Sequence, residues 1–310
     1  MANPMLRPTV RPVGEESVTP WPQSVLLVGC GLIGVSMVKA LTAVLPDVLV
    51  DGVEPHEEHR GTAAKTGCFR RIEMDLSQVN RVGQTYDLVV LAVPVDVACD
   101  LLPQAGTLGE VVMDVCSVKT DICARAEELG LRRRFFPSHP MAGIASEGPS
   151  EATADLFKGR PWLGIAHWTV PFPVVELIAQ LGSVWIALET AALHDGLMAV
   201  VSHSTHVVSL ATMLAFREAV NHWEPPLSST SAAMVCGPAF ADVTRLAKSP
   251  PGFWTRTLLA NRQTTVEHLR RTVGELQDFI DILETRDAVR LRRKLDSARN
   301  AHGRWEQDRL

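Results

Sequence analysis

The sequence predicts an α/β protein in which a doubly wound parallel sheet is followed by an all-helical domain. Three observations carry this prediction. Short apolar, β-rich runs alternate with helix-length segments up to about residue 190. The first of these runs is followed at once by a cluster of glycines. From His194 onward the chain has helical periodicity and almost no strand pattern.

The strand candidates are the short apolar or β-rich runs at residues 24–28, 48–54, 88–93, 111–115, 132–136, 162–166 and 184–188. Helix-length segments fall at residues 32–45, 55–67, 95–105 and 119–130. This alternation predicts a parallel sheet with helices on both faces. We therefore assign residues 23–190 to a sheet domain and 191–310 to a helical domain. Residues 1–22 hold five prolines and no apolar export signal, which predicts a disordered tail.

Composition excludes several classes of protein. Of 310 residues, 46% are hydrophobic and 21% charged, an ordinary globular balance. A net charge of −5 gives no reason to expect a nucleic acid partner. The six scattered cysteines form no CxxC, which favours free thiols in a reducing, cytoplasmic setting. Residues 196–216 carry no charge, but their seven Ser, Thr and His side chains favour a buried helix over a membrane span.

A glycine loop follows the first strand and opens a helix, as residues 29–34 read GCGLIG. In such a loop the first glycine permits a tight turn, the second admits a pyrophosphate and the third allows close packing. The predicted dinucleotide contacts are therefore Gly29, Gly31, Leu32, Ile33 and Gly34. Glu54 ends the second strand 20 residues later, where an acid bonds the ribose 2′-OH.

The acid at the second strand also predicts which dinucleotide binds. Asp51 is a rival to Glu54, although its place before Gly52 favours a side chain that faces elsewhere in the fold. No Arg or Lys follows Glu54 until Arg60, so nothing obvious awaits a 2′-phosphate. The sequence therefore predicts NAD rather than NADP as the cofactor.

A second set of polar residues falls at the ends of later strands. His139 lies in SHPMAG after a predicted strand, and Ser117 ends the preceding one. Open α/β sheets bind their ligands beyond the carboxyl ends of the strands, so both side chains should face one crevice. Ala92, Val93 and Pro94 end the strand before that and are placed to wall a nicotinamide.

The charge-free helix carries a polar stripe. At about 100° per residue, Asp195, Ser202, His206 and Ser209 fall within roughly 60° of arc, with His203 about 60° further round. Such a stripe is explained by mutual bonding in a core, by an active-site wall or by a zinc site. Because the two histidines supply only two metal ligands, we expect no metal.

Two features of the helical half leave alternatives open. Asp242 and Arg245 are spaced i,i+3 and could form a surface pair of little energetic value. An apolar stripe repeats every three or four residues through Val266, Leu269, Val273, Leu276, Ile280 and Leu283. That stripe packs either on its own domain or on a second copy of the chain.

The motifs of this chain are, in sequence, GCGLIGVS, LAVPV, DVCSVKT, SHPMAG with LFKG, HD with VSHSTH, and DVTRLAKS. The order of these motifs resembles that of the prephenate/arogenate dehydrogenase family. The resemblance runs from about residue 25 to residue 283. It implies a Rossmann domain that binds NAD, an all-helical dimerisation domain and a homodimer. It also implies an oxidoreductase of tyrosine biosynthesis that acts on a small molecule in the cytoplasm.

The resemblance also implies roles for single residues. His139 would accept the proton of the substrate 4-hydroxyl as hydride leaves C4 for NAD⁺, and Ser117 would orient it. His203 and His206 would contact the substrate, and Arg245, with Asp242 nearby, would bind a carboxylate. The ring carboxylate would depart as CO₂, and aromatisation would make the reaction irreversible.

The chain departs from the family pattern around this site. Cys116 replaces a common Gly, and Ile144-Ala145 replaces Thr-Glu after HPMAG. Ser204-Thr205 stands for Leu-Pro between the two histidines, and Ala241 for a Lys found in some members. These departures bear on the preferred substrate rather than on the reaction. With the usual Glu absent, we expect prephenate over arogenate, although Glu147 or Asp242 could bind the arogenate ammonium.

Two further functions are compatible with the glycine loop. A β-hydroxyacid-type dehydrogenase or imine reductase would use a helical lysine, and no such motif is evident after Gly196. A non-catalytic NAD-sensing module would keep the loop but would not need His139, Ser117 and Arg245 together.

Overall fold

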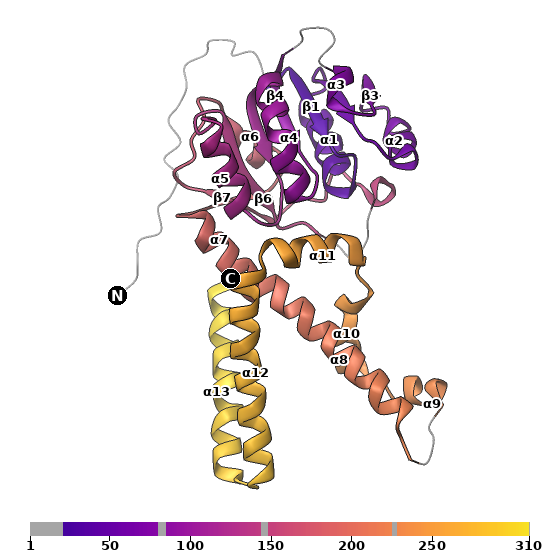
Figure 1. Ribbon diagram of the computed structural model, residues 1–310, viewed down its shortest axis with the longest axis vertical. Helices are drawn as coiled ribbons and strands as arrows, with labels where there is room; N and C mark the ends of the chain where they lie inside the picture. Colours follow the sequence, from indigo (N-terminus) through magenta and orange to yellow (C-terminus); the bar gives the residue numbers. More distant parts are fainter. Residues whose placement is uncertain (1–20, 80–84, 144–147, 225–227, 310) are drawn as a thin grey trace.

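The fold was analysed on a computed structural model, which describes residues 21–79, 85–143, 148–224 and 228–309 (Figure 1). Its eight-stranded sheet has the order β3-β2-β1-β4-β5-β6-β7-β8. The strands are β1 (Ser24–Val28), β2 (Leu49–Val53), β3 (Arg71–Glu73), β4 (Tyr86–Leu91), β5 (Gly109–Asp114), β6 (Phe135–Pro140), β7 (Pro161–Ile165) and β8 (Val184–Leu188). All neighbours pair in parallel except β6 and β7, which are antiparallel. This confirms the predicted doubly wound α/β fold.

Helices cover both faces of the sheet: α1 (Leu32–Val44), α2 (Glu57–Ala64), α3 (Leu76–Val79), α4 (Val95–Leu108), α5 (Thr120–Glu128) and α6 (Val174–Gln180), with a 3₁₀ turn at Pro149–Glu151. Alternate residues of β1 show the two faces. Val25 and Leu27 join a core with α1 and α6, while Leu26 and Val28 join a core with α4 and α5. The period-two alternation of strand side chains thus builds two hydrophobic layers.

The helical half comprises α7 (Ala191–Met198), a π-helical segment (Ala199–His203), α8 (Ser204–Asn221), α9 (Ser229–Met234), α10 (Pro238–Thr244), a 3₁₀ turn (Arg245–Lys248), α11 (Pro251–Ala260), α12 (Arg262–Glu284) and α13 (Ala288–Arg309). Figure 1 shows α8 leading away from the sheet as one arm, with the α12–α13 hairpin as a second. Helix α11 runs beneath the sheet domain and contacts α4.

The structure corrects three details of the sequence prediction. It adds β3, a three-residue strand too short for any apolar pattern to reveal. It places β6 at residues 135–140 instead of 132–136, because Arg132 and Arg133 are exposed in the preceding turn. The predicted tail 1–22 lies outside the described residues up to residue 20, but Trp21 stacks on Phe172 with ring centroids 5.4 Å apart.

The apolar helix of residues 191–221 is less buried than the sequence suggested. By length and composition it could cross a membrane, and only 33% of its most apolar window is buried inside one chain. Leu214 on this helix is 52% exposed. A single chain therefore leaves much of this apolar helix uncovered.

A buried ion pair lies under the carboxyl end of the sheet. Lys119 and Asp114 are both fully buried and joined by a charge-assisted hydrogen bond. Burial by itself lowers the pKa of Lys119, but the Asp114 carboxylate, together with Cys116 and Cys123, holds it above its ordinary value. The two Asp114 oxygens also accept from the backbone N–H groups of Cys116 and Ser138, at 3.0 and 3.2 Å.

Replacing Lys119 by Met should lower the free energy of unfolding by about 3–5 kcal/mol, because the Asp114 carboxylate is left buried without its counterion. Urea unfolding followed by circular dichroism measures the change. The matched control is Lys158→Met, whose pair with Asp155 is 67% and 68% exposed and should matter little. Equal effects of the two substitutions would contradict this assignment.

Candidate active site

The glycine loop between β1 and α1 has the geometry that a dinucleotide requires. Gly29 has φ +98°, and a Cβ there would overlap the carbonyl oxygen of Ala92. A Cβ on Gly34 would overlap the carbonyl oxygen of Gly29. By contrast, a Cβ on Gly31 would meet nothing within 4 Å, so the loop is open at this glycine.

The start of α1 is free to receive an anion. Gly31 is its N-cap residue, with no side-chain cap and no acidic residue in the first turn. Leu32 is buried and Ile33 half-buried against the core, so these two residues can offer a ligand their backbone N–H groups. Helix N-termini of this kind bind phosphate well. The residues present therefore fit a pyrophosphate group.

Glu54, and not Asp51, is the acid beside the loop. The Glu54 carboxylate accepts from the backbone N–H groups of Cys30 at 2.8 Å and His56 at 2.9 Å. Each carboxylate oxygen keeps a further acceptor site for a ribose hydroxyl. Arg60 donates to the backbone carbonyl of Glu54 at 2.8 Å, so a cation lies closer to this acid than the sequence spacing suggested.

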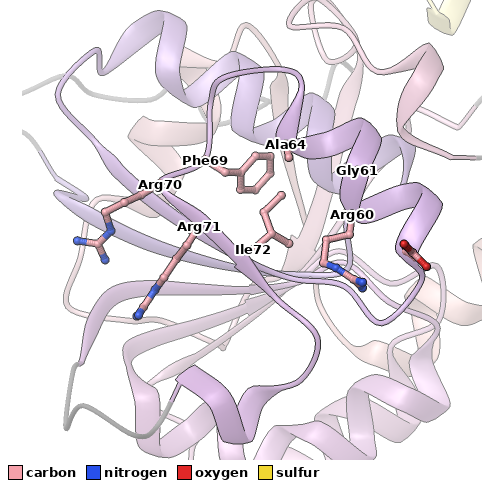
Figure 2. Close-up of a pocket in the computed structure, with 8 residues that line it drawn as sticks. Arg60, Gly61, Ala64, Phe69, Arg70, Arg71 and Ile72 are labelled. Carbon is pink, nitrogen blue, oxygen red and sulfur yellow. The ribbon is translucent and has the colours of Figure 1, made fainter.

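Asp51 is committed to side chains on the far side of β2. It accepts from Arg70 at 2.9 and 2.7 Å, from Arg71 at 3.1 Å and from Tyr86 at 2.6 Å. Figure 2 shows Arg70 and Arg71 on one side of a pocket of about 370 Å³ and Arg60 on the other, with Phe69 and Ile72 between them. The Asp51 carboxylate thus binds side chains near β2 and β3 and not the glycine loop.

His139 lies in β6, where it pairs with Leu163 of β7. Its Nδ1 is 3.0 Å from Nε2 of His194, the fourth residue of α7. Burial lowers the pKa of His139 well below its usual value, and the positive charge of Lys119 acts in the same direction. His139 is therefore a neutral imidazole at neutral pH.

Asp195 joins the helical half to the sheet. It accepts from the backbone N–H groups of Lys119 and Thr120, each at 2.8 Å, and thereby caps α5, which has no side-chain cap of its own. Its Oδ1 also lies 2.8 Å from His194 Nδ1. Burial by itself raises the pKa of Asp195, but these hydrogen bonds together hold it below its ordinary value.

His203 is held by Asn261, which lies between α11 and α12. Asn261 Nδ2 donates to the Asp195 carbonyl oxygen at 2.7 Å and lies 3.0 Å from His203 Nδ1. The carbonyl contact fixes the amide orientation, so His203 Nδ1 is an acceptor and its proton is on Nε2. Burial lowers the pKa of His203 to about 4. His203 thus offers an N–H donor.

His206 stacks on Trp254 of α11, with ring centroids 3.6 Å apart and the planes inclined by 14°. Among the described residues, His206 Nδ1 has no hydrogen-bond partner, nor have the hydroxyls of Ser204 and Ser209. All three side chains are buried. Of the polar stripe, Asp195 is hydrogen-bonded inside the chain, whereas His206 Nδ1 and the Ser209 hydroxyl are not, so the active-site wall remains a prediction for this part of the helix.

The π-helical segment changes which residues share this wall. A regular α-helix would place Ser202 on the face of Asp195 and turn His203 away. In the structure His203 is as buried as His206, while Ser202 is half-buried. The extra residue in the π turn shifts the register, and such segments are common at functional sites.

The remaining predicted residues are placed as follows. Ser117 is half-buried, and its hydroxyl lies 3.4 Å from that of Thr257 on α11. His139 is hydrogen-bonded to His194, a partner that the sequence did not suggest. Cys116 donates to the Val93 carbonyl at 3.3 Å, beside the half-buried Ala92 and exposed Pro94.

Asp242 and Arg245 lie on α10 and the 3₁₀ turn after it, both elements that contact α8. Both side chains are exposed, and in the described part of the chain no ion pair joins them. The surface-pair interpretation is therefore not supported. Within the described ranges, no group of three or more His, Cys, Asp and Glu side chains could hold a metal. Ile144, Ala145 and Glu147 lie outside the described residues.

The sequence reasoning missed four residues of this site. His194, Asn261, Trp254 and Thr257 lie far from SHPMAG along the chain, and each reaches the site through α7 or α11. One signal was available, since His194 directly precedes Asp195 of the polar stripe.

The fold and the loop define a dinucleotide-binding α/β protein with a helical domain. Residues 37–165 match the model of the prephenate dehydrogenase nucleotide-binding domain, and residues 190–297 match that of the prephenate dehydrogenase dimerization domain. The chain is 30% identical over 274 residues to a prephenate dehydrogenase of Lactococcus lactis subsp. cremoris, which covers 86% of this chain and 73% of the relative. This chain belongs to the prephenate dehydrogenase family, an oxidoreductase family.

Further relatives carry related names. A cyclohexadienyl dehydrogenase of Zymomonas mobilis subsp. mobilis is 27% identical over 273 residues, or 85% of this chain and 89% of that protein. The fold is similar to that of Aquifex aeolicus prephenate dehydrogenase solved with hydroxyphenyl propionate and NAD⁺, with a TM-score of 0.75 and 23% identity, covering 92% and 99% of the two chains. The fold is also similar to that of Synechocystis arogenate dehydrogenase, with a TM-score of 0.72 and 24% identity, covering 91% of this chain and 99% of that chain.

Proposed function

We propose that this protein catalyses the NAD⁺-dependent oxidative decarboxylation of prephenate to 4-hydroxyphenylpyruvate, with His139 as the proton acceptor. The observation that carries the proposal is the neutral His139 in β6, with one ring nitrogen held by His194. A neutral imidazole is the base that this chemistry needs near neutral pH. Membership of the family and the names of the relatives support the same reaction.

The reaction needs a hydride acceptor and a base. Bound NAD⁺ supplies the hydride acceptor. His139 takes the proton of the 4-hydroxyl as hydride leaves C4, and the carbon–carbon bond to the ring carboxylate then breaks to release CO₂. The electron pair of that bond completes the aromatic ring, and the phenolate oxygen that results takes a proton.

The residues around the glycine loop fit NAD. The open side of Gly31 and the uncapped start of α1 suit the pyrophosphate. Glu54 suits the ribose hydroxyls, and its charge disfavours a 2′-phosphate. Ala92, Val93 and Pro94 follow β4, where they would wall the nicotinamide.

The helical half would bind the substrate. His203 would donate its Nε2–H to the substrate. The buried His206 Nδ1 and the hydroxyls of Ser204 and Ser209, which have no partner among the described residues, would bind its polar atoms. Arg245 suits a substrate carboxylate because its guanidinium binds carboxylates bidentately. The alternative substrate is arogenate, whose α-ammonium would need an acid such as Asp242. The name of the Zymomonas mobilis relative keeps that alternative open.

We also propose a cytoplasmic homodimer formed through the C-terminal helices. On α12, Val273, Leu276 and Leu283 of the predicted stripe are 61%, 56% and 61% exposed. This favours the dimer seam over packing on the chain's own domain, because contiguous exposed apolar surface marks interaction sites. The dimerization domain of the family supports this proposal.

His139→Asn should fold and bind NAD⁺ but lose about 10²–10⁴ in kcat, the contribution of a positioned general base. Steady-state kinetics with prephenate measures the loss, and quenching of protein fluorescence by NADH reports nucleotide binding. A variant within a few-fold of the unmodified enzyme would refute the role of His139 as base.

The unmodified enzyme should prefer NAD⁺ to NADP⁺, and Glu54→Gln should narrow that preference by tenfold or more. The substitution removes the charge that repels a 2′-phosphate and keeps an acceptor oxygen for the backbone. Because Arg60 lies beside Glu54, the Glu54→Gln/Arg60→Ala double variant serves as control and should lose the gain. The measurement is kcat/KM for both nucleotides, and an unmodified enzyme that prefers NADP⁺ would overturn the assignment of Glu54.

Prephenate should give a higher kcat/KM than arogenate at saturating NAD⁺. The reason is the missing Glu after HPMAG, since an ammonium buried without an acid is costly. The assay compares both substrates with the same enzyme preparation. An arogenate value tenfold above the prephenate value would replace the proposed substrate by the alternative, and turnover of neither would refute the function itself.

A further inference from the structure

Three side chains form a hydrogen-bonded chain that ends at the proposed base, the half-buried His139. His139 Nδ1 lies 3.0 Å from His194 Nε2, and His194 Nδ1 lies 2.8 Å from Asp195 Oδ1. His194 is fully buried and Asp195 is 3% exposed. Asp195 is itself fixed by the N–H groups at the start of α5. The chain therefore begins in the sheet and is anchored by a helix cap.

The chain determines which nitrogen of His139 is basic. The ionised Asp195 carboxylate can only accept, so His194 Nδ1 carries a proton and donates it. In neutral His194 the other nitrogen, Nε2, is then an acceptor, so His139 Nδ1 must carry the proton of the bond between the two rings. His139 Nε2 is left with a free lone pair.

We infer that His194 and Asp195 are positioning residues that hold His139 with Nε2 basic and relay the proton that His139 accepts. This inference rests on the proposed function. The O–H bond of the substrate breaks as an N–H bond forms at His139 Nε2, and the proton on His139 Nδ1 passes to His194 Nε2. After CO₂ leaves, both transfers reverse and the proton returns to the phenolate oxygen, so no proton is gained or lost.

The charges around the two rings favour the proton on His194. The Lys119 ammonium disfavours a positive charge on His139. Lys119 also faces His194, but there Asp195 and Asp114 act in the opposite direction. A cation on His194 is hydrogen-bonded to the Asp195 carboxylate, whereas the described residues give a cation on the half-buried His139 no hydrogen bond to an anion.

The first experiment is a double-mutant cycle. In His194→Gln the amide oxygen can still accept from His139 Nδ1 but cannot take a proton, so kcat should fall about 10²-fold with little change in KM. In the His139→Asn background the same substitution should cost nothing more, because His194 acts only through His139. His222→Gln, at a side chain 73% exposed, is the matched control and should keep full activity.

The second experiment measures kcat in mixtures of H₂O and D₂O. Two protons move in the relayed step, so the rate of the unmodified enzyme should curve with the deuterium fraction. The plot for His194→Gln should be straight. The curved plot is measured on the unmodified enzyme. The inference therefore stays testable even if the His194→Gln protein fails to fold.

The pH profile of kcat/KM supplies a third readout. Activity requires the neutral base, so it is present above the pKa of the coupled histidines and is lost as pH falls through it. Asp195→Asn removes the anion that stabilises the protonated pair, which lowers that pKa. In Asp195→Asn the acidic limb of the kcat/KM profile should therefore move to lower pH, and the plateau value of kcat/KM at higher pH should fall.

The outcomes separate this inference from the proposed function. A straight plot for the unmodified enzyme, an additive cycle or an unmoved acidic limb would overturn the relay. If His139→Asn abolishes turnover while His194→Gln does not, the function stands and the relay fails. If His139→Asn is fully active, the proposed base itself is wrong.

Discussion

The site depends on a single carboxylate, Asp195, that caps a helix of another domain. Helix α5 begins with backbone N–H groups that its own segment leaves uncapped, and α7 supplies the acceptor. The same stretch of α5 carries Lys119, whose side chain reaches Asp114 at the end of β5. Because buried polar groups must be paired, this network allows one docking of α7 on the sheet. That docking brings His194 and His203 of the helical half to His139 of β6.

The fold was largely predictable because its strands are short apolar runs and its helices are amphipathic. The features that the sequence did not predict are those that leave no mark in the pattern of apolar and polar residues. Strand β3 is only three residues long, and the antiparallel step between β6 and β7 depends on the path of residues 141–160. The uncovered surface of residues 191–221 was missed because apolar composition cannot tell a buried helix from one whose partner is another chain.

The site was predictable in part for a similar reason. Glu54 and the glycines follow a strand at fixed spacing, and local geometry alone decides their place. The sequence favoured Glu54 over Asp51, and the structure supplies the reason in the side chains of Arg70, Arg71 and Tyr86 that bind Asp51. Asn261 and Trp254 reach the histidines by long-range packing, and the role of His194 depends on a hydrogen bond across 55 residues of sequence.

The π-helical segment at Ala199–His203 couples two things that are usually separate in a protein. One residue more than an α-helix would hold turns His203 inward, and it also rotates everything beyond it by about 100° about the helix axis. The direction in which α8 presents its apolar side is thus set by the same inserted residue that turns His203 inward. An insertion or deletion of one residue here would alter the orientation of His203 and the outward face of the helix together, so neither property can be changed by length variation without the other.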